Sequence, residues 1–174
     1  ESLRDAGKAA YAAAPNADEA LTEFLIKILA DDVARDNYEP AAELSKVLVD
    51  NGCDKKQLYD PAGIAAFATN DFDAAEKRAK RAEADGTLSE NGRKNLDEIP
   101  DYKKYWQEEQ EIRQKEAAQN DLPRVRLSTS KGDMVIELFE NEAPETVGNF
   151  VNLVEQTFYD GLVFHRVLPA FMAQ

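Results

Sequence analysis

The C-terminal stretch of the chain reads Phe164-His165-Arg166-Val167-Leu168-Pro169-Ala170-Phe171-Met172-Ala173-Gln174. It holds the only histidine of the sequence and one arginine, set among apolar residues. This composition is typical of a strand that enters a binding surface, and not of a solvated tail. The sequence therefore predicts a strand over 162–167 that carries one fixed cation, Arg166.

Upstream of this stretch, apolar and polar side chains alternate with a period of two. Val125 and Leu127 form one run, and Met134 and Ile136 form the next. Such alternation predicts half-buried strands, and Gly132 between the runs can adopt the positive φ that a tight turn needs. The sequence therefore predicts a β-hairpin that begins after Pro123.

A helix is predicted to follow this hairpin. Pro144 suits the first position of a helix, and Glu145 in the first turn complements the helix dipole. The apolar positions recur at helical spacing; they are Val147, Phe150, Val151 and Val154. The dipeptide Asp160-Gly161 then predicts a turn.

Four motifs of this region resemble the N-terminal third of a cyclophilin, in the order and spacing of that family of peptidyl-prolyl cis–trans isomerases. They are Lys131–Leu138, Ala143–Phe150, Tyr159–Val167 and Phe171–Gln174. The resemblance implies that residues 124–174 are part of an eight-stranded antiparallel β-barrel, of which they supply about three strands and one helix. We expect the remainder to come from a companion chain that completes the barrel. Ala170 departs from the family, which usually has glycine there.

The resemblance also implies roles for individual residues. Arg166 is the expected catalytic residue, while Phe171 and Met172 resemble the apolar proline pocket and Gln174 the amide that fixes the substrate backbone. His165 is a weaker candidate for substrate binding. The alternatives are a surface role for Arg166, core packing for Phe171 and Met172, and a core histidine at 165.

The N-terminal part of the sequence predicts helices. Pro15 ends an alanine-rich first helix, and Asp18 is a plausible N-cap for a second. The second helix carries an apolar stripe that is expected to face a core; its members are Leu21, Phe24, Leu25, Ile28 and Leu29.

An internal repeat with an offset of about 34 residues follows. It aligns Tyr38 with Phe72 and Gly52 with Gly86, and small residues such as Gly63 allow two antiparallel helices to approach closely. Segment 21–86 thus resembles two tetratricopeptide-like units, and an ordinary helical bundle with a chance echo is the alternative. Residues 87–119 are expected to form a helical cap, in which Thr87 or Ser89 starts a short helix and Pro100 separates it from a long polar one.

The predicted organisation is therefore multidomain, α and β. A helical tetratricopeptide-like domain spans 1–119, a linker spans 120–123, and the partial cyclophilin-like barrel spans 124–174. The predicted function is prolyl isomerisation in protein folding, with proline-containing polypeptides as substrates and the helical repeats binding a protein partner. A non-enzymatic interaction or chaperone module with an inactive cyclophilin-like domain is the alternative.

Charge and composition exclude other classes of function. The formal net charge is −13, which disfavours nucleic-acid binding because phosphates need clustered Lys and Arg. No apolar run is long enough for a membrane span. With one histidine and one cysteine, Cys53, we expect neither a metal nor a cofactor. The protein is expected to be soluble, and either cytoplasmic or, if a leader preceded Glu1, exported.

Overall fold

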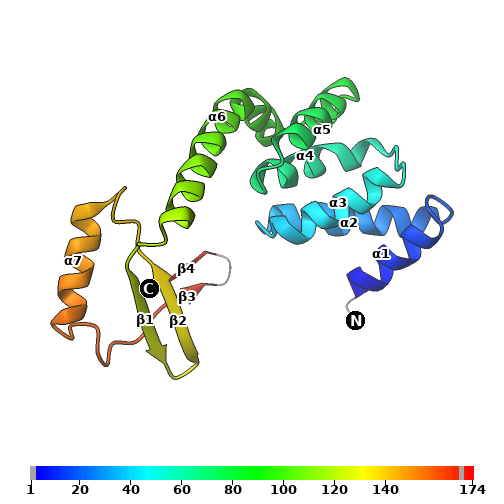
Figure 1. The fold of residues 1–174 in the computed structure, drawn as a ribbon. Helices are drawn as coiled ribbons and strands as arrows, with labels where there is room; N and C mark the ends of the chain where they lie inside the picture. The colour runs from blue at the N-terminus through cyan, green and yellow to red at the C-terminus, as the bar shows by residue number, and fades with distance from the viewer. Residues whose placement is uncertain (1–2, 169–170) are drawn as a thin grey trace. The chain divides into compact units, whose positions relative to one another are not determined.

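The computed structural model describes residues 3–168 and 171–174 (Figure 1). The chain divides into two compact units, Glu1–Gln107 and Glu108–Gln174. The described part of the first unit contains helices and turns only, and all described strands lie in the second unit. The division between the units falls within a long helix and not at residues 120–123. Residues 120–123 are neither helix nor strand, and their role as a linker stays a prediction.

The first unit is built from consecutive helices. These are α1 (Leu3–Ala13), α2 (Glu19–Ala34), α3 (Tyr38–Asp50), the 3-10 turn η1 (Lys56–Leu58), α4 (Tyr59–Ala68), α5 (Phe72–Ala84) and the first part of α6 (Glu90–Gln119). The expected helix end before Pro15 is confirmed. The expected N-cap is confirmed too, because the Asp18 carboxylate accepts a hydrogen bond of 3.0 Å from the Leu21 N–H.

The buried stripe of α2 differs from the expected one. Phe24 is 38% exposed, so its predicted place in the core is wrong. The stripe is rotated by about one residue, and it includes two polar residues that an apolar pattern does not reveal. Its buried members are Thr22, Leu25, Ile26, Leu29 and Asp32. Both polar members are satisfied; the Thr22 hydroxyl, for example, donates to the Asp18 carbonyl at 2.9 Å.

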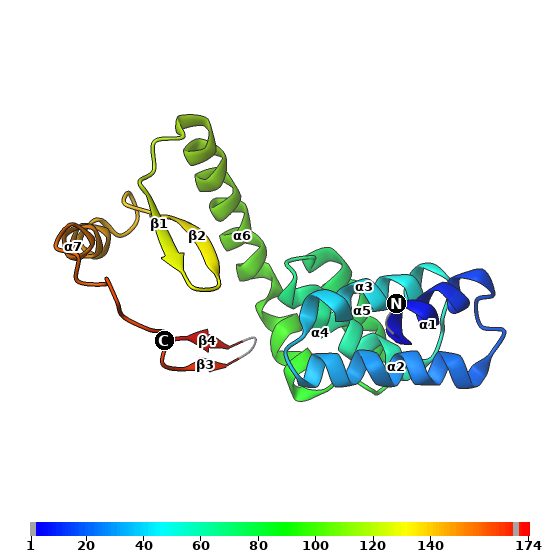
Figure 2. The ribbon, with the colours of Figure 1, turned by 90° about the horizontal axis from the view of Figure 1, so that it is seen from below.

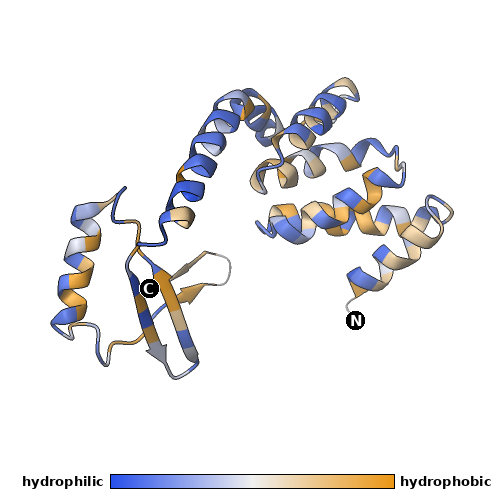
Figure 3. Ribbon diagram, viewed as in Figure 1, coloured by the Kyte–Doolittle hydropathy of each residue, from blue (hydrophilic) through white to orange (hydrophobic). Residues whose placement is uncertain are grey.

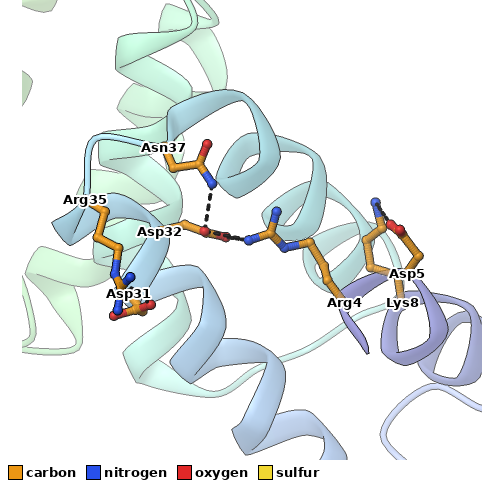
Figure 4. Close-up of polar contacts among 7 residues, drawn as sticks. All are labelled: Arg4, Asp5, Lys8, Asp31, Asp32, Arg35 and Asn37. Atoms are coloured by element: carbon orange, nitrogen blue, oxygen red, sulfur yellow. Dashed lines mark hydrogen bonds and ion pairs between the residues drawn. The ribbon is translucent and has the colours of Figure 1, made fainter. Parts of the chain in front are cut away.

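Asp32 ties α1 to α2 (Figure 4). Nη2 of Arg4 in α1 lies 2.5 and 2.6 Å from the two carboxylate oxygens of Asp32. The Asn37 side chain donates a third hydrogen bond of 2.9 Å to the same carboxylate. Only 8% of the Asp32 side chain is exposed, so this charge depends on its partners.

The 34-residue repeat of the sequence is also found in the positions at which two helices begin and end. Helices α3 and α5 have 13 residues each, and they begin at the aligned positions Tyr38 and Phe72. Gly52 and Gly86, which follow them, have φ of 73° and 71°. The first helices of the two pairs differ, since α2 has 16 residues and α4 has 10. The assignment of this echo to tetratricopeptide repeats stays a prediction.

Gly63 in α4 allows the close helix contact that the sequence predicts. A Cβ atom there would lie 3.3 Å from the backbone nitrogen of Ala79 and 3.6 Å from the carbonyl oxygen of Ala75, both in α5. On the same interface, buried Arg78 donates to the Ala62 carbonyl at 3.1 Å. The helices are therefore held by close backbone approach as well as by a buried polar contact.

Helix α6 corrects one prediction. It runs without interruption from Glu90 to Gln119 and contains Pro100, so the expected break at this proline is wrong. Pro100 is exposed, whereas the neighbouring Ile99 is buried, and Leu96 and Trp106 pack against the same core. The missing backbone hydrogen bond thus falls on the solvent side, while packing on the other face holds the helix together. Ser89 is confirmed as the starting residue, because its hydroxyl accepts from the Gly92 N–H at 3.0 Å.

The second unit begins with the predicted hairpin. Strands β1 (Arg124–Thr129) and β2 (Gly132–Glu137) pair in antiparallel fashion, and Gly132 has the expected positive φ, 125°. Helix α7 (Pro144–Glu155) follows, with Pro144 in its first turn and Val147 buried as predicted. Gly161, at the expected turn, has φ of 79°.

The predicted strand over 162–167 is largely wrong. Residues 162–166 are not a strand, and the short strand β3 (Val167–Leu168) pairs only with β4 (Met172–Ala173). The described chain thus forms two separate two-stranded sheets, and residues 162–165 have no neighbouring strand to pair with.

Much apolar surface of the second unit is exposed. Figure 3 shows hydrophobic colour along β2 and on one side of α7, while the part of α6 that leads toward β1 is mostly hydrophilic. The exposed large side chains of this unit include Val135, Phe139, Phe158, Leu162, Val163, Phe164, Val167 and Phe171. None of the described helices is long and apolar enough to cross a membrane.

Replacing Asp32 with alanine is expected to destabilise the first unit by about 2–3 kcal/mol, because Arg4 and Asn37 lose a buried partner. The neighbouring Asp31 is the matched control. It forms only an exposed ion pair of 3.1 Å with Arg35 (Figure 4), so Asp31→Ala should cost less than about 1 kcal/mol. Urea unfolding followed by Trp106 fluorescence measures both; equal losses would contradict the assignment.

Candidate active site

The predicted site residues lie on or beside the β3–β4 hairpin (Figure 2). Val167 pairs with Ala173, and Leu168 pairs with Met172. The ladder continues by one more pair: the Arg166 N–H donates to the Gln174 carbonyl at 3.1 Å, and the Gln174 N–H donates to the Arg166 carbonyl at 2.8 Å. The register of the hairpin is therefore defined over three residue pairs.

This register sorts the candidates onto two faces. Residues that lie opposite each other in an antiparallel pair project to the same face, and successive residues alternate. Arg166, Leu168, Met172 and Gln174 therefore share one face, which we call the Arg166 face. Val167 and Ala173 lie on the other, and His165 follows them by alternation. Leu168 was missed from sequence; its signal is its spacing of two from Arg166 and its pairing with Met172.

The Arg166 face is accessible. Arg166 and Gln174 are exposed, and Met172 is half-buried. None of the ion pairs found among residues 3–168 and 171–174 involves Arg166. An exposed guanidinium beside apolar Leu168 and Met172 provides hydrogen-bond donors next to an apolar contact, which suits a polypeptide ligand.

Phe171 lies at the end of the hairpin turn, where its N–H donates to the Leu168 carbonyl at 3.1 Å. Its side chain is 77% exposed, so it does not serve as core in this chain. Ala170, where the sequence departs from the cyclophilin pattern, lies outside the described residues, as does Pro169. The roles predicted for Phe171 and the other site residues stay predictions.

A groove of about 670 Å³ also lies in the second unit. It is lined by β1, by Phe150 and Val154 of α7, and by the segment 159–165. His165 lines this groove and Arg166 does not. Of the Arg166 face, Gln174 also lines the groove.

A buried carboxyl group lies elsewhere in the second unit. Glu116, near the end of α6, is 8% exposed, and its Oε1 has no hydrogen-bond partner among the described residues. Burial raises the pKa of Glu116 above its ordinary 4.5, and the Glu142 carboxyl adds to this through repulsion and hydrogen bonding. The nearby Glu137 is paired with Arg124 at 2.7 Å. The sequence had not singled out Glu116.

No group of three or more His, Cys, Asp or Glu in the described chain is arranged to hold a metal ion.

Comparison with known families assigns the C-terminal segment. The sequence model of the family described as cyclophilin type peptidyl-prolyl cis-trans isomerase/CLD matches residues 124–174. This segment is therefore similar to part of a cyclophilin-type domain. We call it the cyclophilin-type segment; it contains the Arg166 face and the groove.

Curated relatives agree with this assignment. A peptidyl-prolyl cis-trans isomerase of Synechococcus elongatus is 56% identical over 53 residues, which cover 30% of this chain and 37% of the relative. One of Helicobacter pylori is 44% identical over 64 residues, or 37% of this chain and 38% of the relative. The chain therefore spans well under half the length of these relatives.

One relative aligns beyond the cyclophilin-type segment. A putative bifunctional phosphatase/peptidyl-prolyl cis-trans isomerase of Streptococcus pyogenes is 34% identical over 122 residues, which cover 68% of this chain and 24% of the relative. Because 68% of the chain far exceeds residues 124–174, the similarity extends into the helical residues. No solved structure matches the chain.

The Glu116→Gln variant is expected to remove one pH dependence of the second unit. Because the folded-state pKa of Glu116 is raised, the free energy of unfolding should fall as the pH rises from about 4.5 toward that raised pKa. Glutamine cannot ionise, so the free energy of unfolding of the variant should not decrease over this pH range. The variant should therefore be more stable than the wild type at neutral pH. Urea unfolding between pH 4 and 8, followed by circular dichroism, measures it. Exposed Glu155→Gln is the control, and a wild-type slope in Glu116→Gln would contradict the assignment.

Proposed function

We propose that the protein to which this chain belongs is a peptidyl-prolyl cis–trans isomerase, with Arg166 as its catalytic residue. The observation that carries the proposal is the cyclophilin-type segment, in which Arg166, Met172 and Gln174 lie on one accessible face. The names of the relatives from Synechococcus and Helicobacter support the same activity.

Prolyl isomerisation requires few chemical groups, and the Arg166 face carries groups of the required kind. Rotation about an X–Pro bond has a barrier of about 18–20 kcal/mol, because the amide is conjugated. A catalyst needs no nucleophile; it must hold the twisted amide more tightly than either planar form. The Arg166 guanidinium can donate hydrogen bonds to the prolyl backbone and favour a pyramidal nitrogen. Phe171 and Met172 would then contact the proline ring, and Gln174 would hold the neighbouring backbone.

The proposed substrates are proline-containing polypeptides. Such chains present an apolar ring beside a free carbonyl oxygen, which fits a face that combines Met172 with Arg166. The exposed apolar residues of the second unit support the further proposal that a companion polypeptide, or further residues of the same protein, completes the barrel.

The helical unit is proposed to bind a protein partner through tetratricopeptide-like repeats. The support is the 34-residue spacing of α3 and α5 together with the matched positive φ at Gly52 and Gly86. The alternative is a non-enzymatic interaction or chaperone module with an inactive cyclophilin-like domain. The high exposure of Phe171 favours that alternative in a protein where nothing completes the pocket.

Replacing Arg166 with alanine is expected to lower kcat/KM for prolyl isomerisation by about 100-fold, the usual loss when a donor to the transition state is removed. Arg166→Lys should recover only part of it, because a point charge lacks the planar pair of donors. A protease-coupled assay with a short prolyl peptide measures the rates. The assay uses a chimeric protein, in which the Synechococcus relative supplies the rest of the isomerase domain.

Arg126→Ala is the matched control, since Arg126 is another exposed strand arginine of the same segment. It should leave the rate unchanged, and circular dichroism verifies that each variant is folded. Equal rates for wild type and Arg166→Ala would reject the proposed role and favour the non-enzymatic alternative.

A further inference from the structure

Four aromatic rings of the first unit form a continuous group. They are Phe67 of α4, Phe72 of α5, and Tyr102 and Tyr105 of α6, which we call the tyrosine ridge. The ring centroids of Phe67 and Tyr102 are 4.9 Å apart, and those of Tyr102 and Tyr105 are 6.2 Å apart. Successive rings thus touch, from the half-buried Phe67 outward to Tyr105.

The outer part of the ridge is not needed for the core. Phe72 is buried at 5% exposure, together with Ala66, Ala75 and Ile99. Tyr102 and Tyr105, in contrast, are 42% and 58% exposed. Single exposed aromatic side chains are common, but neighbouring aromatic rings in contact are typical of recognition surfaces. The ridge therefore offers a rigid apolar surface that costs little side-chain entropy on binding.

The charge around the ridge is mostly negative. Lys103, next to Tyr102, is paired with Asp73 at 2.7 Å and with Glu76 at 3.0 Å, and Glu76 is also paired with Lys80 at 2.6 Å. Lys104 beside Tyr105 adds one more basic side chain. Among the helical neighbours of the two tyrosines, the acidic residues Glu98, Asp101, Glu108 and Glu109 outnumber these lysines. Asp101 precedes Tyr102 and is exposed. The Asp73 side chain is 93% exposed and remains open to a second cation. A cationic ligand is therefore favoured over an anionic one.

We propose that the tyrosine ridge binds an extended, proline-containing polypeptide segment that carries Lys or Arg beside its prolines. Proline-rich segments adopt the polyproline II conformation, with a rise of about 3.1 Å per residue, and they dock on aromatic surfaces. The 6.2 Å between the Tyr102 and Tyr105 rings matches two residues of such a segment. Basic side chains would lie near Asp73 and Asp101.

The ligand class rests on the proposed function, since a prolyl isomerase acts on proline-containing chains. The ridge would be a second site for that class, held by the helical unit and separate from the Arg166 face. Holding a client by one segment raises the effective concentration of its other prolines at the catalytic residue. The ridge would thereby favour basic, proline-rich clients without taking part in the rotation.

Binding to the whole 174-residue chain is the test, with three synthetic peptides as probes. The first repeats the unit Pro-Lys-Pro-Ala, the second has Glu in place of Lys, and the third has Ala in place of Pro. Trp106, the only tryptophan, packs against the core cluster that includes Phe72 of the ridge, so its fluorescence should report occupancy. Isothermal titration calorimetry gives the affinity independently.

The Pro-Lys peptide should bind saturably below about 1 mM Kd, and Tyr105→Ala should weaken it at least fivefold. The Glu peptide and the proline-free peptide should each bind at least fivefold more weakly than the first. Phe24→Ala is the matched control, because Phe24 is an exposed aromatic residue of the same unit outside the ridge; it should leave the affinity unchanged.

Three outcomes would overturn the proposal: no saturable binding by wild type, the same affinity in Tyr105→Ala, or equal affinity for the proline-free peptide. Arg166→Ala should not alter this binding, and Tyr105→Ala should not alter the isomerisation of a short peptide by the chimera. Failure of the ridge and failure of the proposed activity are thus observed in separate measurements.

Discussion

The pair of backbone hydrogen bonds between Arg166 and Gln174 is the constraint on which the candidate site depends. Together with the Leu168–Met172 and Val167–Ala173 pairs, it sets the register of the last hairpin. A slip of one residue would move every side chain of one strand to the opposite face. The guanidinium would then lie away from Met172 and Gln174. The proposed chemistry therefore depends first on this register, because the register places Arg166 on the same face as Met172 and Gln174.

The helical unit is held in a different way. Its helices approach closely at small residues such as Gly63, and buried polar groups, above all Asp32 with Arg4 and Asn37, define which helix faces which. Such groups are costly unless fully paired, so they disfavour alternative arrangements of an alanine-rich unit. The exposed rings of Tyr102 and Tyr105 lie outside this core, which leaves them free for recognition.

Local signals allowed much of the fold to be predicted. The Asp18 cap, the Gly132 turn and the start of α7 at Pro144 depend on backbone chemistry that single residues reveal. The errors came from tertiary context. Pro100 stays inside α6 because the opposite face of the helix is packed. Phe24 lies outside the buried stripe of α2, which includes the polar residue Asp32 instead. Residues 162–165 lack a strand to pair with. For the candidate site, the motifs predict roles for Arg166 and Met172, and these roles stay predictions; the register adds that the two residues share a face and that Leu168 lies on it too.

The most direct test of this account is a nuclear magnetic resonance titration of the chimera that completes the domain, with a short prolyl peptide. The account predicts that the signals of the Arg166 side chain, the Met172 methyl group and the Gln174 amide shift together in a saturable way. The Val167 methyl groups, on the opposite face of the same strand, should change little. Equal shifts on both faces, or shifts at Val167 without any at Arg166, would contradict the central claim that the hairpin presents one binding face.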